Sequence, residues 1–304
     1  TLTCNGSRHK IPPLFFFFFQ FLMLQDKVKS SLQMIQRAER LALSLNPSGF
    51  WVAFSGGKDS QVLLELCKMA EVQFHAYYNV TSNDPPENVY FIRHYYPEVT
   101  FVHPKVNFFH LIEKKGLPTL KHRFCCEQLK ERSGAGYVVV TGVRREESLK
   151  RAGYNSVDVI SRRKEHQGRN DYSIESIEVA NHVCIKGKDK VMLRPILEWS
   201  ECDVWEFLRL RGLPINPCYA KFQRVGCMFC PFAKRSQIEF FEQEYPKFRQ
   251  LFVDSLQRFL DRRAERLPNA TDSLCGAEQF YDWWKSGLKL KTYLAKKQQF
   301  QQEL

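Results

Sequence analysis

The chain of 304 residues lacks an apolar run that reaches the roughly 20 residues needed to cross a bilayer. Its apolar run at residues 14–24 follows Arg8, His9 and Lys10 and has the length of a signal-peptide core. A signal peptide is therefore one interpretation, but no small-residue cleavage site follows the run. We expect no membrane partner, and we interpret residues 1–22 as a non-native or disordered leader before a protein that begins at Met23.

The sequence also lacks the two best-known phosphate loops at its glycine-bearing turn. Residues 55–60 read SGGKDS, which matches neither G-x-x-x-x-G-K-S/T nor G-x-G-x-x-G. An apolar run at 50–54 precedes this turn and a helical pattern follows it, so we predict a strand, a glycine turn and a helix. Such a turn presents backbone N–H groups and the positive end of a helix dipole to an anion. The predicted phosphate-binding residues are Ser55, Gly56, Gly57, Lys58, Asp59 and Ser60.

Acidic residues are in the minority. The 45 Lys and Arg residues against 33 Asp and Glu leave a net charge of +12, and the pI is near 9.2. This balance favours anionic partners, which include nucleotides and nucleic acid. The hydrophobic share of 44% is ordinary for a globular protein with a real core.

Apolar runs alternate with helical patterns through the first two thirds of the chain, and no internal repeat is found. Strands are predicted near residues 50–54, 72–80, 100–104 and 137–142, and a further short strand is predicted at Met192 and Leu193. This alternation predicts an α/β fold with a doubly wound, mainly parallel sheet. Ligands of such sheets bind beyond the carboxyl ends of the strands, where SGGKDS, NVTSND and TGVRREES all fall.

The rest of the chain completes the expected domain organisation. A helix at 26–45 precedes the first strand, and Ser200 is predicted to cap another helix with Asp203 at its third position. Residues 142–190 show a weak pattern and are expected to form basic loops, from which Arg144 and Arg151 are the best candidates to contact a polyphosphate. We therefore expect a nucleotide-binding domain over residues 23–231 and a helical C-terminal extension over 232–304.

Two close cysteine pairs stand out among the ten cysteines. Cys125 and Cys126 are adjacent, which disfavours a disulfide between them, and Cys227 and Cys230 form a C-x-x-C-P unit. Two such pairs suit a four-thiolate site, for which we predict a 4Fe-4S cluster. Zinc is a less favoured occupant because adjacent ligands are unusual for it, and a redox or structural pair is a further alternative. A cluster requires a reducing compartment and so predicts a cytoplasmic protein.

These motifs together resemble the phosphoadenosine phosphosulfate (PAPS) reductase family, including the adenylyl-sulfate reductases, of the pyrophosphatase-loop superfamily. The resemblance runs from about Gly49 to Pro231. It rests on SGGKDS, the adjacent cysteines, RPILEWSECDVWEFL, GLPINPCY leading to GCMFCP, and a G-x-R segment with its downstream residues, namely Gly142, Arg144, Ser148 and Arg151. It implies a Rossmann-like, adenine nucleotide alpha-hydrolase-like fold, an adenine nucleotide above the turn held also by Gly142, Arg144 and Arg151, and the cluster of the adenylyl-sulfate reductases.

Two segments depart from the reductases. The reductases carry a C-terminal E-C-G-L/I-H segment whose cysteine attacks the substrate sulfur and leaves a thiosulfonate that a reduced thioredoxin resolves. Here only Cys275 and Gly276 match that segment. The reductases also carry D-T-G where this chain has TSND at 81–84. The resemblance thus implies Lys58, Arg144 and Cys275 as catalytic residues and a thioredoxin-like reductant, while these departures weaken the match at the sulfate end of the substrate.

Three functions are therefore compatible with the sequence. The first is reduction of adenylyl sulfate or PAPS in sulfur metabolism. The alternative is an ATP-pyrophosphatase-type sulfurtransferase that modifies nucleic acid, by tRNA thiolation or DNA phosphorothioation, as resemblance to thiouridine synthases implies. The third is a nucleotide-sensing binding module. Catalytic need for Cys275 would favour the first, and salt-dependent binding of tRNA or DNA would favour the second.

Overall fold

The structure is a computed structural model that describes residues 13–161, 172–179, 189–267, 274 and 276–302. It divides into two compact units. Unit 1 comprises Thr1–Tyr78, Glu87–Val102 and Gly134–Val225, and unit 2 comprises Asn79–Pro86, His103–Ser133 and Gly226–Leu304. Each unit is described by itself.

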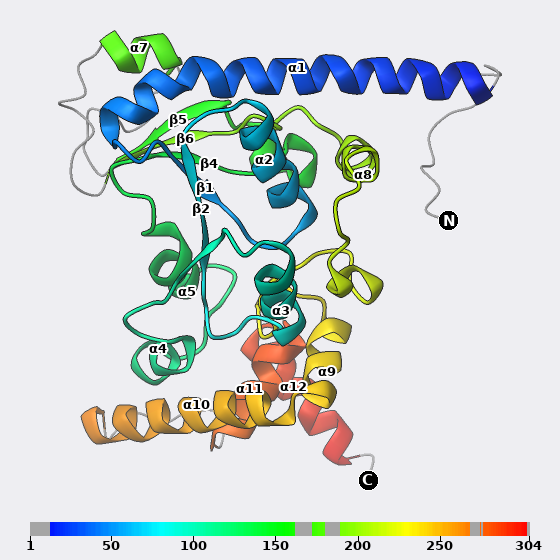
Figure 1. The fold of residues 1–304 in the computed structure, drawn as a ribbon. Coiled ribbons are helices and arrows are strands. Elements are labelled where there is room, and N and C mark those ends of the chain that lie inside the picture. Colours follow the sequence, from blue (N-terminus) through cyan, green and yellow to red (C-terminus); the bar gives the residue numbers. More distant parts are fainter. Residues whose placement is uncertain (1–12, 162–171, 180–188, 268–273, 275, 303–304) are drawn as a thin grey trace. The chain divides into compact units, whose positions relative to one another are not determined.

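Unit 1 is built on a six-stranded sheet with helices around it (Figure 1). The strands are β1 (Phe50–Ala53), β2 (Phe74–Asn79), β3 (Thr100–Val102), β4 (Val138–Val140), β5 (Val157–Ile160) and β6 (Lys190–Leu193), in the order β3-β2-β1-β4-β6-β5. β1 pairs in parallel with β2 and β4, and β4 pairs in parallel with β6. The predicted mainly parallel α/β fold is confirmed.

The helices of unit 1 cover a continuous apolar core. They are α1 (Pro13–Leu45), α2 (Lys58–Met69), α3 (Pro86–Tyr95), α6 (Leu149–Ala152), α7 (Ile174–Val179) and α8 (Glu201–Leu210). The predicted helix at 26–45 is present and continues from Pro13, and it contacts β1, β4, α2 and α7. It buries Ile35, Ala38 and Leu41 at helical spacing.

One strand of unit 1 was not expected. The segment at 142–190, predicted to form loops, contains β5, which pairs antiparallel with β6 at the edge of the sheet. Val157 and Val159 alternate with Asp158 and Ile160, and this alternation buries one face of the strand and leaves Ile160 exposed. Four residues are too short a pattern to be recognised among polar neighbours.

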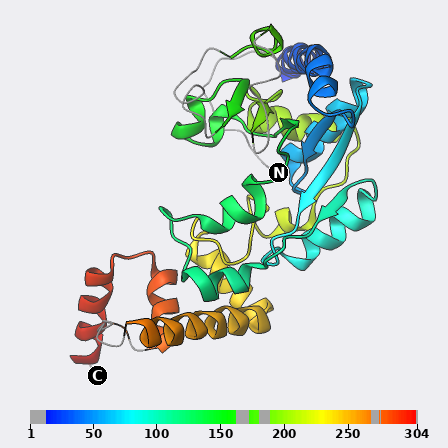
Figure 2. The same cartoon turned by 90° about the vertical axis from the view of Figure 1, so that its left-hand side faces the viewer.

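Unit 2 gathers the segment after β3 and the C-terminal helices around an aromatic core. Its helices are α4 (Phe108–Lys115), α5 (Phe124–Cys126), α9 (Arg235–Glu244), α10 (Pro246–Arg266), α11 (Gly276–Ser286) and α12 (Leu290–Gln302). α10 packs on α4, α9 and α11, and Figure 2 shows α11 and α12 as neighbouring helices. Phe252 is fully buried, and its ring centre lies 5.3 Å from that of Tyr281, 5.6 Å from that of Phe229 and 5.9 Å from that of Phe108. The predicted helical C-terminal part is confirmed.

Across the described part of the chain, no helix has both the length and the apolar character required of a membrane span.

Candidate functional site: the nucleotide turn and the cysteine pairs

The SGGKDS segment forms the predicted turn between β1 and α2 in unit 1. Gly56 has a φ of +75°, and a Cβ at this position would lie 2.3 Å from the Asn88 side-chain oxygen. Only glycine fits both this backbone conformation and this space. Gly57 precedes α2 in an extended conformation, and no side chain caps the helix from this position. Ser60 closes the turn, because its hydroxyl donates to the Gly57 carbonyl and accepts from the Ser55 N–H.

Two buried asparagines hold the carbonyl groups of this turn. The Asn88 side-chain amide donates to the Ser55 carbonyl at 3.2 Å, and the Asn216 amide donates to the Gly56 carbonyl at 2.8 Å. Asn216 also donates to the Asn88 side chain at 2.7 Å. Because the C=O and N–H of a trans peptide point in opposite directions, these bonds turn the N–H groups of Gly56 and Gly57 the other way, where the Gly57 N–H donates to the Ser55 hydroxyl at 3.4 Å. The turn is therefore arranged to present amides to an anion.

Tyr219 holds the first amide of α2. Its hydroxyl accepts a hydrogen bond from the Lys58 N–H at 2.8 Å, and burial raises the pKa of this phenol. The Lys58 ammonium lies 5.6 Å from the centre of the Tyr219 ring and 5.9 Å from that of Trp205. These distances fit cation–π contacts. Tyr219 is therefore a neutral hydroxyl at the helix N-terminus, with a proton that a ligand oxygen can accept.

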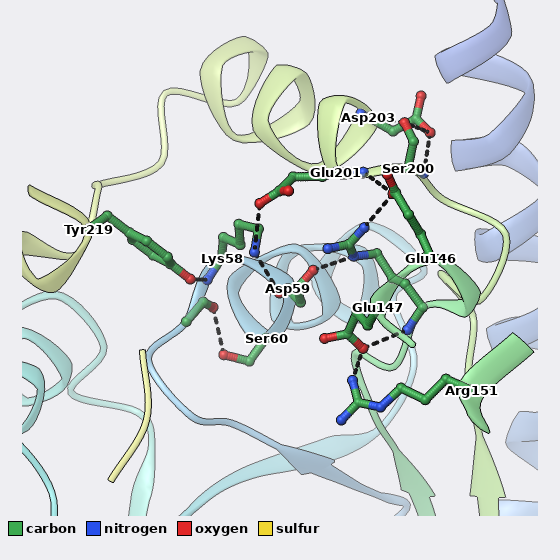
Figure 3. Close-up of polar contacts among 12 residues, drawn as sticks. Lys58, Asp59, Ser60, Glu146, Glu147, Arg151, Ser200, Glu201, Asp203 and Tyr219 are labelled. Atoms are coloured by element: carbon green, nitrogen blue, oxygen red, sulfur yellow. Dashed lines mark hydrogen bonds and ion pairs between the residues drawn. The ribbon is translucent and has the colours of Figure 1, made fainter. Parts of the chain in front are cut away.

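Lys58 and Arg144 both contact the carboxylate of Asp59, which Figure 3 shows beside Lys58. The Arg144 Nε donates to one oxygen of Asp59 at 2.7 Å, and the Lys58 Nζ lies 3.3 Å from the other. Lys58 also pairs with Glu201 at 3.4 Å, and Arg144 pairs with Glu146 at 3.0 Å. Lys58 is 5% exposed and Arg144 is 3% exposed, so both predicted catalytic cations are held rigidly. Asp59 acts here as the residue that positions them.

Gly142 and Arg151, the other expected nucleotide-binding residues, lie on the segment that follows β4. A Cβ on Gly142 would lie 3.0 Å from the Asp59 backbone, so glycine permits the close approach of this segment to α2. Arg151 lies on α6, pairs with Glu147, and has a pKa lowered by burial and by the charge of Arg224. The structure thus brings every expected nucleotide-binding residue into unit 1, around one helix N-terminus or on the segment beside it.

The four cysteines of the two pairs lie together in unit 2. Cys125 and Cys126 end α5, and all four thiols, including Cys227 and Cys230, are free. A hydrogen bond from Cys125, together with the nearby charges of Lys130 and Arg123, lowers the pKa of Cys126 to about 6. The Lys130 ammonium lies 3.4 Å from the Cys227 sulfur. Thiolates of low pKa are the ligands that iron and zinc require.

The thiols have the donor chemistry of a cluster without its closed geometry. Within the described residues, no three His, Cys, Asp or Glu side chains lie in position to hold a metal ion. The four sulfurs nevertheless belong to one unit and act on one another electrostatically, since Cys227 contributes to the raised pKa values of both Cys125 and Cys230.

Asn83 fastens the C-x-x-C loop within unit 2. Its side chain accepts from the Phe229 N–H at 3.2 Å and donates to the Phe229 carbonyl at 3.1 Å, while its own carbonyl accepts from the Met228 N–H at 2.8 Å. The Thr81 hydroxyl lies 3.7 Å from the Cys227 sulfur. Asn83 and Thr81 are almost fully buried. The TSND segment, which departs from the reductase pattern, thus supports the second cysteine pair.

The family model of the phosphoadenosine phosphosulfate reductase domain matches residues 49–233, well over half of the chain. The chain belongs to this family. The matched range contains the nucleotide turn and both cysteine pairs. The expected family is confirmed.

Two curated proteins and a solved structure illustrate what the chain is similar to. Two uncharacterized proteins of Methanocaldococcus jannaschii are similar to the chain. One is 26% identical over 79% of this chain and 58% of that protein, and the other is 27% identical over 69% and 42%. The chain therefore spans about half the length of the curated relatives it matches. A solved structure of PAPS reductase from Candida auris, in a phosphate complex, is 13% identical, with a TM-score of 0.43 over 68% of this chain and 95% of that one.

Four residues of this PAPS reductase domain contact the turn although the sequence analysis did not select them, namely Asn88, Trp205, Asn216 and Tyr219. Asn216 and Tyr219 belong to GLPINPCY. The polar Asn216 between two prolines is the sequence feature that could have identified this segment as part of the site. Trp199 is buried in the core, whereas Trp205 faces Lys58. Cys275, the expected nucleophile of a reductase, lies outside the described residues.

Proposed function

We propose that this protein binds an adenine nucleotide on the Ser55–Ser60 turn and acts at its α-phosphate, with adenylyl sulfate or PAPS as substrate. The observation that supports the proposal is the turn itself, in which two buried asparagines hold the Ser55 and Gly56 carbonyls and so direct the N–H groups of Gly56 and Gly57 away from them. Lys58, Arg144 and Tyr219 surround the same helix N-terminus. Preorganised donors of this kind stabilise charge on a leaving phosphate at about 2–4 kcal/mol each.

In the proposed reduction, a thiolate attacks the sulfur of the substrate and the bond from that sulfur to the phosphate oxygen breaks. AMP, or AMP carrying a 3′-phosphate, leaves with the electron pair, and a thiosulfonate remains on the protein. A dithiol reductant of the thioredoxin type then releases sulfite and is oxidised to a disulfide. Cys275 is the proposed nucleophile. Lys58 and Arg144 hold the phosphate on which negative charge develops.

Cys125, Cys126, Cys227 and Cys230 are the proposed ligands of a 4Fe-4S cluster, with zinc as the less favoured occupant. A cluster bound there would supply a redox-active, thiolate-ligated group within unit 2. The free state of all four thiols and their position in one unit support this assignment. A cluster of this kind needs a reducing compartment, which supports a cytoplasmic location.

A second function, the ATP-dependent transfer of sulfur to nucleic acid, is favoured by a different observation. The carboxylates of Asp59, Glu146 and Glu201 lie against Lys58 and Arg144. Each of these carboxylates offers the kind of oxygen ligand that the Mg²⁺ accompanying ATP prefers, although no three of them lie in position to hold a metal ion among the described residues. In this function an acceptor oxygen attacks the α-phosphate of ATP, pyrophosphate leaves, and sulfur later displaces AMP from the activated acceptor.

Product analysis separates the two functions. Protein purified without oxygen is incubated with ATP, adenylyl sulfate or PAPS in the presence of a dithiol. AMP or its 3′-phosphate together with sulfite, lost in Cys275→Ser, establishes the reductase. AMP and pyrophosphate from ATP, increased by added nucleic acid, establish the second function. Absence of nucleotide cleavage under all conditions would contradict both.

Lys58→Met tests the turn as the reaction centre, with Lys68→Met as its matched control. Both lysines lie on α2, but Lys68 is near the C-terminal end of the helix, where it is exposed and pairs with Glu98. We expect Lys58→Met to lower kcat/KM by about 10²-fold, since a fixed cation near the α-phosphate is lost. Equal activity of the two variants would remove Lys58 from the proposed mechanism.

A further inference from the structure

Unit 2 carries a group of cations where the C-terminal ends of α4 and α10 meet. Glu113 holds Arg258 at 2.7 Å and Arg262 at 3.7 Å, and both arginine side chains remain half exposed. A cavity of about 460 Å³ lies beside them. Its charged lining residues are Glu113, Lys114, Arg262, Arg263, Glu265 and Arg266. Positive charge exceeds negative charge on these walls.

The cationic character continues from α4 to the segments that carry the cysteine pairs. The ammonium of Lys115, the last residue of α4, lies 5.6 Å from the centre of the Phe124 ring, next to Cys125. The Arg123 guanidinium lies 5.4 Å from the ring of Phe232, which follows the C-x-x-C-P unit. Lys121, His122 and Arg123 are all exposed. Residues 114–133 and 226–235 together contain eight Lys or Arg and two Glu.

An exposed aromatic ring lies within this cationic surface. Phe232 is 58% exposed although it is a large apolar side chain, and one of its neighbours is a guanidinium. A phenyl ring in this setting offers a face on which a nucleobase can stack, while adjacent cations contact the phosphates on either side of the base. An acidic protein would be attracted by the cations alone and would make no use of the ring.

We propose that this surface binds single-stranded nucleic acid. The basic band consists of Lys114, Lys115, Lys121, Arg123, Phe232, Lys234, Arg258, Arg262, Arg263 and Arg266. Its cations hold the sugar-phosphate backbone, and Phe232 stacks on one base beside the cysteine pairs. If the bound nucleic acid is the substrate of the enzyme, the role of the band rests on the second proposed function, the transfer of sulfur to nucleic acid. Binding of nucleic acid to the band can be tested without any catalysis.

Binding of a fluorescein-labelled 15-nucleotide oligouridylate to the full chain is measured over a series of salt concentrations. The assay contains no ATP, adenylyl sulfate or PAPS. We expect log K to fall linearly with log salt, with a slope of about −0.7 for each phosphate contacted. Lys121→Gln and Arg262→Gln should each reduce the magnitude of that slope by about 0.7. Phe232→Leu should weaken binding by about tenfold and leave the slope unchanged, because stacking carries no counterion release.

Arg93→Gln is the matched control. Arg93 lies 5.2 Å from the ring of Phe101, in unit 1, and forms the same kind of cation–aromatic pair away from the band. Its removal should leave both affinity and slope unchanged. Circular dichroism confirms that each variant is folded, and all substituted side chains of the band are exposed or half exposed.

Three outcomes overturn the proposal: no salt-dependent binding, equal loss in Arg93→Gln and the band variants, or unchanged binding in Phe232→Leu with equal competition by polyglutamate. The last outcome would identify a docking surface for an acidic protein. Because the assay contains no ATP, adenylyl sulfate or PAPS, failure of the catalytic proposals leaves the result intact. A weak response to oligouridylate and a strong one to oligothymidylate supports the band and identifies DNA as the nucleic acid.

Discussion

The SGGKDS turn in unit 1 and the cysteine segments in unit 2 differ in how many hydrogen bonds and ion pairs hold their functional groups in place. At the turn, Asn88 and Asn216 hold the carbonyl groups and Asp59 holds Lys58 and Arg144. At the cysteine segments, Asn83 fastens one loop, but the four sulfurs do not form a metal-binding arrangement among the described residues. A phosphate site can be built from backbone and side-chain hydrogen bonds, whereas a thiolate site is closed by its metal. The two sites should therefore respond differently to the same kinds of change.

The largest effect is expected from a methyl group placed inside the turn. Gly56→Ala should destabilise the protein by about 3 kcal/mol or more and abolish nucleotide binding, because the added Cβ meets the Asn88 oxygen at a positive φ. Gly212→Ala is the control, since Gly212 also has a positive φ but a Cβ there would meet nothing within 4 Å. Denaturant unfolding should show a loss of only about 1–2 kcal/mol for it. Equal losses would show that the backbone conformation, and not the close approach, makes glycine necessary.

Removal of the buried amide behind the turn is expected to have the next largest effect. Asn216→Ala leaves the Gly56 carbonyl and the Asn88 side chain without their shared donor, which should cost about 2–3 kcal/mol and weaken nucleotide binding at least tenfold. Asn107→Ala removes the N-cap of α4 in unit 2 and should cost about 1 kcal/mol of stability without changing nucleotide affinity. Isothermal titration with AMP and denaturant unfolding measure the two quantities. If Asn216→Ala bound AMP as tightly as the wild type, the hydrogen bond from Asn216 to the Gly56 carbonyl would not be needed for nucleotide binding.

A smaller effect is expected at the cysteine segments. Asn83→Ala should speed amide exchange at Phe229 by about tenfold, because this N–H loses its acceptor, and should lower the iron bound per chain after anaerobic reconstitution. Asn79→Ala is the control, because Asn79 bonds to Ser133 and leaves the C-x-x-C loop untouched. Removal of iron by a chelator should speed exchange at residues 227–230 and leave residues 55–60 unaffected. Wild-type protein that takes up no iron would contradict the cluster, whereas normal iron in Asn83→Ala would contradict only the role of Asn83.

The smallest effect concerns a buried thiol of unit 1 near the residues that hold the turn. Burial, and then the charge of Glu87, raises the pKa of Cys218 to about 11, above its ordinary value near 9. A thiol whose folded-state pKa is raised contributes stability that is present below pH 9 and is lost as the pH rises through 11. Cys218→Ala should therefore flatten the fall in stability between pH 9 and 11, as measured by thermal unfolding at each pH. An unchanged alkaline profile would show that Cys218 titrates normally.

The parts of the site that the sequence predicted are those made by neighbouring residues. The strand, turn and helix around SGGKDS follow from apolar spacing and two glycines, and the cap at Ser200 follows from its distance to Asp203. The free state of the paired cysteines agrees with the geometric argument against a bond between adjacent residues. Each of these inferences involves residues that are close in the chain.

The parts that the sequence did not predict depend on contacts over long separations. The strand at Val157–Ile160 is stabilised by pairing with β6, because four residues have little strand preference of their own. The expectation that Arg144 is free to meet a phosphate left out Asp59, which lies 85 residues away in the chain. The departure at TSND suggested a weaker match to the reductases, whereas the structure shows Asn83 bonded to a loop 146 residues distant.

The family, the alternation of strands and helices, the position of the SGGKDS turn and the presence of two cysteine pairs could all be predicted from sequence patterns. This was possible because hydrophobic periodicity, glycine conformations and motif spacing are properties of neighbouring residues. Folding in three dimensions is what places Asn88, Asn216 and Tyr219 against the turn and one carboxylate against both cations. These contacts form only after the order of the strands has brought distant segments to the same edge of the sheet, and no local pattern records that order.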